Sequence, residues 1–410
     1  MSTQQTILIV GASLAGAKAA EALRAQGFDG RLVLIGEEPE RPYERPPLSK
    51  AHLSGAPKDV HVHDETFYAR HSIELRTSTT VTELNPAEHT VTLADTTRIR
   101  YDKALLTTGA TPRRLTVPGA DLDGVHYLRT LADADRLLAA AARARAVAVI
   151  GAGWIGTEVT ASLRQRGLPV TLIDPASTPL ERVLGRDAGT VFRDLHAAHG
   201  VALHLGDGVR SLHGAGRVAE VRTTGGTAVP ADLVVVGIGA VPRVELAAAA
   251  GLAVDNGIVV DEHLRTSHPD VYAAGDVARA WHPGYREHIR VEHWSNAINQ
   301  GAAAAANMLG TAAAYADIPY FFSDQYDLGM EYTGYSPHFD RVVFRGDPHG
   351  GEFIAFWLTG GRVTGGMNVN IWDVNEYLQQ LARRHARVDP DRLADPRVPL
   401  ETLVSEAANL

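Results

Sequence analysis

Residues 7–16 read ILIVGASLAG, and residues 147–156 read VAVIGAGWIG. In each stretch, a run of apolar and mostly β-branched residues is followed by a glycine-rich turn. The apolar run is typical of a strand covered on both faces of a parallel sheet, and the turn is typical of one that opens a helix. The stretches start about 140 residues apart, which is too far for a solenoid repeat. The sequence therefore predicts two copies of one strand–turn–helix domain.

The sequence around both stretches alternates between strand and helix patterns. Apolar runs at 31–35, 170–173 and 233–236 predict further strands, and the segments 15–25 and 157–166 predict helices. Such alternation indicates parallel sheets built from βαβ units.

The pattern changes after Pro319. Segments 320–322, 341–344 and 352–358 are rich in aromatic residues or alternate in polarity, which is typical of antiparallel strands. We therefore predict an α/β chain with two Rossmann-like dinucleotide-binding domains and a smaller α+β C-terminal domain. The predicted boundaries place residues 1–107 and 243–319 in a discontinuous first domain, 108–242 in the second and 320–410 in the third.

Composition excludes several classes of function. The chain has 410 residues, 45% of them hydrophobic and 21% charged, and a formal net charge of −9. This balance argues against broad binding to nucleic acid or an anionic membrane. The uncharged stretch 294–316 is rich in alanine and carries polar residues, so it predicts a partly buried helix and not a membrane span. Since the N-terminus has no signal-peptide pattern, we expect a cytoplasmic enzyme.

The chain contains no cysteine. This count excludes disulfides, thiolate zinc sites, cysteine-ligated iron–sulfur clusters and every mechanism that uses a reactive thiol. His61 and His63, beside Asp64, lack a third and fourth metal ligand, and the same holds for His196 and His199. We therefore predict that these histidines are surface residues and that the chain has no metal site.

The first glycine turn, residues 11–16, is followed 21 residues after Gly16 by Glu37, at the end of the next predicted strand. Amides and the positive dipole at the start of a helix favour a pyrophosphate, and a carboxylate at this spacing accepts hydrogen bonds from ribose hydroxyls. Ser13 replaces the middle glycine of the usual pattern, but its side chain is small enough for a phosphate to approach. A turn that serves packing alone is the other interpretation.

The second glycine turn, residues 151–156, has all three glycines of the pattern. Asp174 follows 18 residues after Gly156, at a strand end. A carboxylate there binds the ribose diol and repels a 2′-phosphate, so it predicts NADH as the second nucleotide. Arg182 is the nearest arginine that could pair with a phosphate, which leaves NADPH open.

Three further motifs favour a flavoprotein. Residues 268–276 (HPDVYAAGD), 107–110 (TTGA) and 237–242 (GIGAVP) occur in the order in which similar motifs occur in the glutathione-reductase structural superfamily. The chain therefore resembles a flavoprotein with one FAD-binding and one NAD-binding domain. In the disulfide reductases of that superfamily a cysteine pair carries electrons away from the flavin, so the absence of cysteine implies direct transfer to a protein carrier, a quinone-like molecule or oxygen.

A closer resemblance covers nearly the whole chain. It rests on residues 42–50 (PYERPPLSK), 127–130 (YLRT), 292–301 (EHWSNAINQG) and 322–326 (FSDQY). These are similar to segments of the bacterial NADH-dependent ferredoxin and rubredoxin reductases of cytochrome P450 and Rieske-type oxygenase systems. The resemblance implies FAD and NADH as cofactors and a [2Fe-2S] ferredoxin as partner of a monomer or homodimer. A rubredoxin reductase and a reductase of a small acceptor, of the monodehydroascorbate or quinone type, are the alternatives.

Together, the motifs and the resemblance imply two sets of binding residues. The FAD set is Gly11, Ser13, Leu14, Ala15, Gly16, Glu37, Arg45, Pro46, Lys50, Val81, Thr108, Gly109, Arg129, Gly275, Asp276, Glu292, His293, Trp294 and Ala297. The NAD set is Gly151, Gly153, Trp154, Ile155, Gly156, Glu158, Asp174, Arg182 and Gly239.

The resemblance also implies three catalytic residues, Lys50, Glu158 and Trp294. It places Lys50 against the flavin ring with Glu158 as its partner, where a cation stabilises the negative charge of the reduced flavin. It places Trp294 at the start of a helix whose N-terminus points at the flavin. A solvated lysine, a first-turn glutamate favoured by the helix dipole, and a core tryptophan are the structural alternatives.

The C-terminal tail is rich in arginine, with Arg383, Arg384, Arg387, Arg392 and Arg397. Such a tail could attract an acidic ferredoxin. A solvated helix face explains the same pattern.

Overall fold

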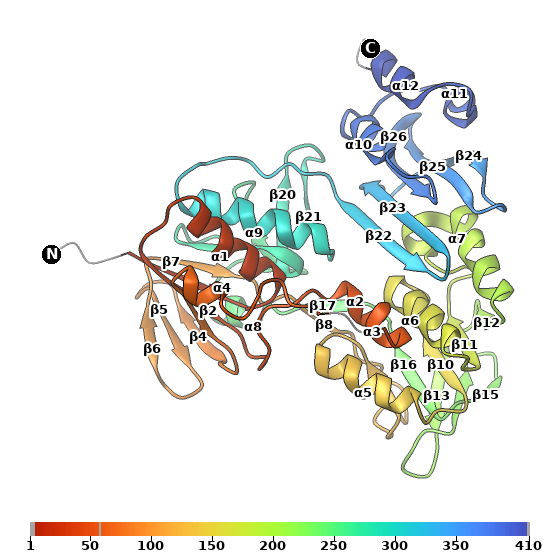
Figure 1. Ribbon diagram of the computed structural model, residues 1–410, viewed down its shortest axis with the longest axis horizontal. Coiled ribbons are helices and arrows are strands. Elements are labelled where there is room, and N and C mark those ends of the chain that lie inside the picture. Colours follow the sequence, from red (N-terminus) through yellow and green to blue (C-terminus); the bar gives the residue numbers. More distant parts are fainter. Residues whose placement is uncertain (1–4, 57–58, 408–410) are drawn as a thin grey trace. The chain divides into compact units, whose positions relative to one another are not determined.

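The computed structural model describes residues 5–56 and 59–407 (Figure 1). Its contacts divide the chain into two compact units. One consists of Met1–Glu44, Asp59–Thr111 and Ala240–Pro319, and the other of Arg45–Lys58, Pro112–Gly239 and Tyr320–Leu410. We call them the first and the second unit.

A five-stranded parallel sheet forms the centre of the first unit. Its order is β19 (Val271–Ala273), β7 (Lys103–Leu106), β1 (Thr6–Val10), β2 (Arg31–Ile35) and β3 (Ile73–Arg76). The central strands β1 and β2 are short apolar runs, and Ile7, Leu34 and Leu105 are completely buried in the core. The continuous apolar pattern therefore marks strands that are covered on both faces, as the sequence predicts.

Two long helices of the first unit, α1 (Leu14–Ala25) and α9 (Trp294–Met308), lie side by side (Figure 1). They approach closely at Gly301, where a Cβ atom would lie 2.5 Å from the Ala15 carbonyl oxygen. The smaller elements of this unit are α4 (Phe67–Arg70), β4 (Val81–Asn85), β5 (Thr90–Leu93), β6 (Arg98–Arg100), β17 (Ala240–Pro242), α8 (Glu245–Ala249), β18 (Ile258–Val260), the 3-10 helix η1 (Gly275–Val277), β20 (Ala278–His282) and β21 (Glu287–Ile289).

The second unit contains a similar parallel sheet. Its order is β12 (Ala202–Leu205), β11 (Val170–Asp174), β10 (Val147–Ile150), β16 (Leu233–Val236) and β9 (Val125–Tyr127). Helices α5 (Leu131–Ala141), α6 (Trp154–Gln165) and α7 (Glu181–Ala198) and strands β13 (Val209–His213), β14 (Glu220–Thr223) and β15 (Ala228–Pro230) complete this part. Strand β8 (Ala110–Pro112), of which Ala110 and Thr111 belong to the first unit, pairs with β17 of that unit. Helix α6 begins at Trp154, three residues before the predicted 157–166. Gly153 has extended backbone angles and is the N-cap, so the helical conformation starts at the next residue.

The rest of the second unit is a five-stranded antiparallel sheet, which confirms the predicted change after Pro319. Its order is β22 (Tyr320–Gln325), β23 (Leu328–Gly334), β26 (Arg362–Val369), β25 (Glu352–Thr359) and β24 (Arg341–Asp347). Trp357 is buried in a core shared with α7, and Phe356 in another shared with α10 (Asn375–Arg383), α11 (Pro390–Ala394) and α12 (Leu400–Ala407). The sheet is therefore covered on both faces.

The segment Arg45–Lys58 groups with the second unit, whereas the predicted boundaries place it in the first domain. It contains the short helices α2 (Pro46–Ser49) and α3 (Ala51–Ser54). Leu53 is completely buried there in one core with Leu137 and Leu163, which explains the grouping. The division into three domains stays a prediction.

We predict that Trp357→Phe destabilises the second unit by about 2 kcal/mol. The Trp357 indole donates a hydrogen bond to the buried Leu184 carbonyl oxygen at 2.9 Å, and phenylalanine leaves that oxygen without this donor. Denaturant unfolding measures the change, with Trp372→Phe as the control because the Trp372 side chain is 55% exposed. Equal midpoints for the two variants would contradict the prediction.

Candidate active site

The first glycine turn has the geometry of a phosphate cradle. Gly11 has φ +119°, and a Cβ atom there would lie 2.1 Å from the Thr107 carbonyl oxygen. The turn is therefore restricted to glycine at this position, and it lies directly against the end of the sheet. The described Ser13 side chain makes no capping hydrogen bond, so the first amides of α1 keep their donors for an anion. These residues fit the pyrophosphate of a dinucleotide.

Glu37, directly after β2 and Gly36, pairs with an arginine that the sequence motifs do not include. Both Arg243 amino groups contact the carboxylate, one of them at 2.8 Å, and this bonding raises the pKa of Arg243. The Arg243 backbone accepts a hydrogen bond from the Thr108 hydroxyl at 2.7 Å and donates one to the Gly109 carbonyl at 2.9 Å. Arg243 thus links three predicted FAD residues, and a ribose would share Glu37 with it.

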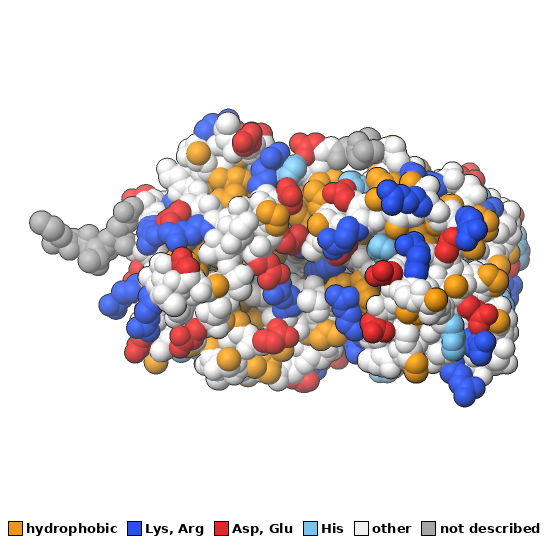
Figure 2. Space-filling model, turned by 90° about the horizontal axis from the view of Figure 1, so that it is seen from below, with side chains coloured by type: hydrophobic (Ala, Val, Ile, Leu, Met, Phe, Trp, Pro, Cys, Tyr) orange, Lys and Arg blue, Asp and Glu red, His pale blue; other side chains and the backbone are white. Residues whose placement is uncertain are grey.

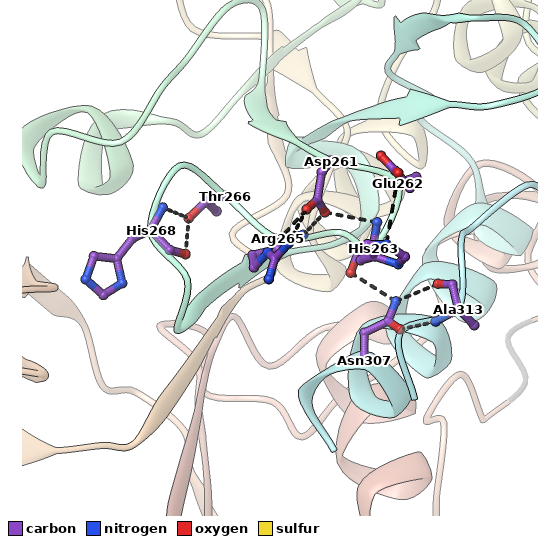
Figure 3. Close-up of polar contacts among 8 residues, drawn as sticks. All are labelled: Asp261, Glu262, His263, Arg265, Thr266, His268, Asn307 and Ala313. Atoms are coloured by element: carbon purple, nitrogen blue, oxygen red, sulfur yellow. Dashed lines mark hydrogen bonds and ion pairs between the residues drawn. The ribbon is translucent and has the colours of Figure 1, made fainter. Parts of the chain in front are cut away.

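Hydrogen bonds fix the motif at residues 268–276 to α9. Figure 3 shows the loop before the motif, where Asp261 accepts from the His263 amide at 2.9 Å and Asn307 donates to the His263 carbonyl at 3.0 Å. At the other end of the motif, the Gly275 amide donates to the Gln300 side chain at 2.9 Å. The half-buried Asp276 is thereby held beside the helix that begins at Trp294.

The start of α9 brings together other predicted FAD residues. The His293 side chain caps the helix by accepting from the Ser295 amide at 3.3 Å. Trp294 is half-buried and packs in a small apolar cluster with Leu14 and Ala297. Glu292 is exposed and pairs with Arg290, whereas Val81 packs against the core at the start of β4. The structure thus unites the first turn with Trp294 and Ala297.

The second glycine turn, in the second unit, is equally tight. A Cβ atom at Gly156 would lie 1.8 Å from the Gly151 carbonyl oxygen. Asp174 accepts hydrogen bonds from the Ala152 amide at 2.6 Å and from the Ala176 amide at 2.7 Å. The carboxylate expected to bind a ribose is therefore fixed beside the turn. Gly153, Ile155, Arg182 and Gly239 are exposed and Trp154 is half-buried.

Lys50 and Glu158 form the ion pair that the resemblance implies. Lys50 Nζ lies 2.8 Å from Glu158 Oε1, and the Glu158 side chain is only 4% exposed. Two hydroxyls that the sequence analysis missed complete its environment: Ser49 donates to Oε2 at 2.5 Å and Ser323 donates to Oε1 at 2.7 Å. In the same unit, Arg45 beside Pro46 donates to the Arg129 carbonyl. Buried charges require such partners, so neither Lys50 nor Glu158 is an ordinary surface residue.

The Glu158 environment continues to a buried histidine. Gln325 donates to the Thr157 hydroxyl at 3.0 Å and to the Ser323 hydroxyl at 3.3 Å, and its oxygen accepts from His196 Nε2 at 3.0 Å. Burial lowers the pKa of His196 to about 4. The prediction that His196 is a surface residue is therefore wrong.

The spacing of α7 could have identified this histidine. Ala188, Phe192 and His196 recur every four residues on its buried face, after the break in the helix at Gly185. His199 is half-buried and stacks on Tyr326 with ring centroids 3.6 Å apart. His61 and His63 are also only partly exposed, because they contact Asp59 and Glu21.

Among the described residues, one group of three side chains could hold a metal ion: His89, His268 and Asp270. The spacing of these residues in the sequence gives no sign of this group. His268 Nδ1 accepts a hydrogen bond from the Asp270 amide at 3.3 Å, which uses one of the potential ligand atoms.

The distribution of charged side chains on the surface and the hydropathy of the helices bear on possible binding to nucleic acid or a membrane. On the face shown in Figure 2, acidic and basic side chains are interspersed. Within residues 5–56 and 59–407, no helix is long and apolar enough to cross a membrane.

Two dinucleotide cradles and a lysine paired with a buried glutamate define a nucleotide-dependent oxidoreductase. A family model described as pyridine nucleotide-disulphide oxidoreductase matches residues 5–301, and one described as reductase C-terminal matches residues 320–404. The chain belongs to the pyridine nucleotide-disulphide oxidoreductase family. This membership implies FAD and NAD(H) as its cofactors.

Curated relatives and solved structures match the full length. Rhodocoxin reductase of Rhodococcus erythropolis is 39% identical over 98% of this chain and 94% of its own. The ferredoxin–NAD(+) reductase component of the anthranilate 1,2-dioxygenase system of Burkholderia cepacia is 41% identical, over 97% and 98%. The structure of the covalent putidaredoxin reductase–putidaredoxin complex matches with TM-score 0.95 and 36% identity, over 99% of each chain. These matches confirm the fold class and the resemblance to reductases of oxygenase systems.

We predict that acid destabilises the second unit through His196. Its pKa of about 4 in the folded protein lies below the usual 6.5, so the unfolded chain takes up the proton first and stability falls as the pH drops from 6.5 towards 4. Between pH 7 and pH 5 this contributes about 2 kcal/mol.

Denaturant unfolding of His196→Asn at both pH values tests this, with the exposed His213→Asn as the control. The His196 variant should lose less stability between pH 7 and pH 5 than the control. An equal loss would contradict the prediction.

Proposed function

We propose that this chain is a ferredoxin reductase that uses NADH and FAD to reduce a [2Fe-2S] ferredoxin, which then serves a cytochrome P450 or a Rieske-type oxygenase. The observation that carries the proposal is the presence of two glycine turns, each followed by a carboxylate, in a chain without cysteine. Relatives named as ferredoxin reductases of such systems, 36–41% identical over nearly the whole chain, support it.

FAD, when bound, supplies a site that accepts a hydride and releases electrons singly. We assign its pyrophosphate to the turn 11–16 and the N-terminus of α1, and its adenosine ribose to Glu37. Asp276 and the N-terminus of α9 serve the rest of the cofactor, as the resemblance predicts. Each of these residues belongs to the first unit.

The second unit supplies the NADH site in this proposal. The amides of the turn 151–156 bind the pyrophosphate and Asp174 binds the ribose diol. We assign to Lys50 the stabilisation of negative charge on the reduced flavin, because it is a cation held by a buried carboxylate. Glu158 keeps Lys50 in place and can contact the nicotinamide amide.

The partner belongs to the proposal as well. The chain has no thiol to receive electrons from the flavin, so the acceptor takes them directly from reduced FAD. We propose a [2Fe-2S] ferredoxin as this acceptor and a monomeric or homodimeric enzyme in the cytoplasm. A rubredoxin or a small quinone-like acceptor is the alternative that kinetics distinguishes.

Anaerobic stopped-flow spectroscopy of the FAD-loaded protein tests the function. NADH should bleach the flavin absorbance, and the reduced protein should then reduce a ferredoxin with saturation at low carrier concentration. Turnover with a quinone should need a much higher acceptor concentration. Lack of bleaching by NADH, or saturation by the quinone alone, would contradict the proposal.

We predict that Asp174→Asn lowers the preference for NADH over NADPH by about tenfold, since a charge-assisted hydrogen bond to the ribose and the repulsion of the 2′-phosphate are both lost. The ratio of kcat/KM for the two coenzymes measures the preference. Asp187→Asn, at an exposed position of α7, is the matched control. An unchanged ratio in Asp174→Asn would refute the assignment.

A further inference from the structure

Glu158 is the end of a chain of hydrogen bonds that starts in the C-terminal sheet. Its Oε1 accepts from Ser323 at 2.7 Å, and Ser323 lies on β22, 165 residues farther along the sequence. The Ser323 hydroxyl has one proton, and it donates this proton in the hydrogen bond to the carboxylate. In any further hydrogen bond the Ser323 oxygen must be the acceptor, and the Gln325 amide nitrogen is the donor at 3.3 Å.

The orientation of Gln325 is fixed on both sides. Its amide nitrogen also donates to the Thr157 hydroxyl at 3.0 Å. The Thr157 hydroxyl in turn donates a hydrogen bond that is shared between the Gly153 and Trp154 carbonyls, at 3.1 and 3.0 Å. Its oxygen accepts from His196 Nε2 at 3.0 Å. Because the Ser323 proton is donated to Glu158, only the amide nitrogen of Gln325 can face Ser323, and the Gln325 oxygen therefore faces His196, which must carry its proton on Nε2.

The protonation of His196 sets the direction of this series of hydrogen bonds. A neutral imidazole that donates from Nε2 must accept at Nδ1, and the Tyr326 hydroxyl lies 3.2 Å from Nδ1. The donors therefore run one way, from Tyr326 through His196, Gln325 and Ser323 to the carboxylate. In such a chain each bond polarises the next, and all of them favour negative charge at its end.

Burial makes these bonds hard to replace with water. Thr157, His196 and Ser323 are completely buried, and Gln325 is 1% exposed. Tyr326 adopts the left-handed backbone region with φ +58° at the turn after β22, which is strained for a tyrosine. Its ring is held by stacking on His199.

We propose that Ser323 and Gln325 of β22 are positioning residues for flavin reduction, which hold the Glu158 carboxylate and through it Lys50. This inference rests on the proposed function, because it concerns the step in which NADH reduces the flavin. It gives the C-terminal sheet a part in that step, in addition to any part in binding a carrier.

Stopped-flow reduction of the FAD-loaded protein by NADH, over a range of pH, tests the proposal. Ser323→Ala should lower the limiting rate of flavin reduction about tenfold, and Gln325→Met should lower it less, because it acts through Ser323. Both should also change the pH profile of the rate, because each removes a donor from the hydrogen bonds that hold the Glu158 carboxylate. Ser323→Thr, which keeps the hydroxyl, should restore most of the rate.

Asp324→Asn is the matched control, because Asp324 is exposed on the same strand. FAD content is measured for each variant, and if Ser323→Ala does not hold FAD, Gln325→Met carries the test. Rates and pH profiles equal to those of the control would overturn the proposal while the function stands. If NADH fails to reduce the unmodified protein, the proposed function itself falls.

Discussion

The buried negative charge of Glu158 is the constraint on which the second unit depends. A carboxylate with 4% exposure needs a cation and further donors, and it receives them from Lys50, Ser49 and Ser323. These donors come from segments on both sides of α6 in the sequence. Together with the apolar contacts of Leu53, these contacts of the charge hold Arg45–Lys58 with residues 112–239 and 320–410, and they join β22 to α6.

The sequence predicted those parts of the fold that depend on local pattern. The runs 7–10, 31–35, 147–150, 170–173 and 233–236 are all in parallel strands, because burial on both faces requires continuous apolar residues. The glycine turns were recognisable for the same reason, since steric limits at Gly11 and Gly156 allow no side chain. The start of α6 was misplaced because the backbone angles of Gly153, and not the polarity of its neighbours, set the N-cap.

The site was predictable only in part. The resemblance identified Lys50 and Glu158, but spacing gave no sign of Ser49, Ser323 or Gln325, which lie at least 109 residues from Glu158 or its neighbour Thr157 in sequence. Arg243 reaches Glu37 across 206 residues. Pairings of this kind depend on how distant segments pack, and no local period records them. His196 was missed for another reason, since its polar type was given more weight than its place on the apolar face of α7.

A double-mutant cycle between Lys50 and Glu158 tests the central claim most directly. The limiting rate of flavin reduction by NADH is measured for the unmodified protein, Lys50→Met, Glu158→Gln and the double variant. If the two residues act as one unit, the double variant should be about as slow as the slower single variant. Losses that multiply as for independent residues would contradict the account.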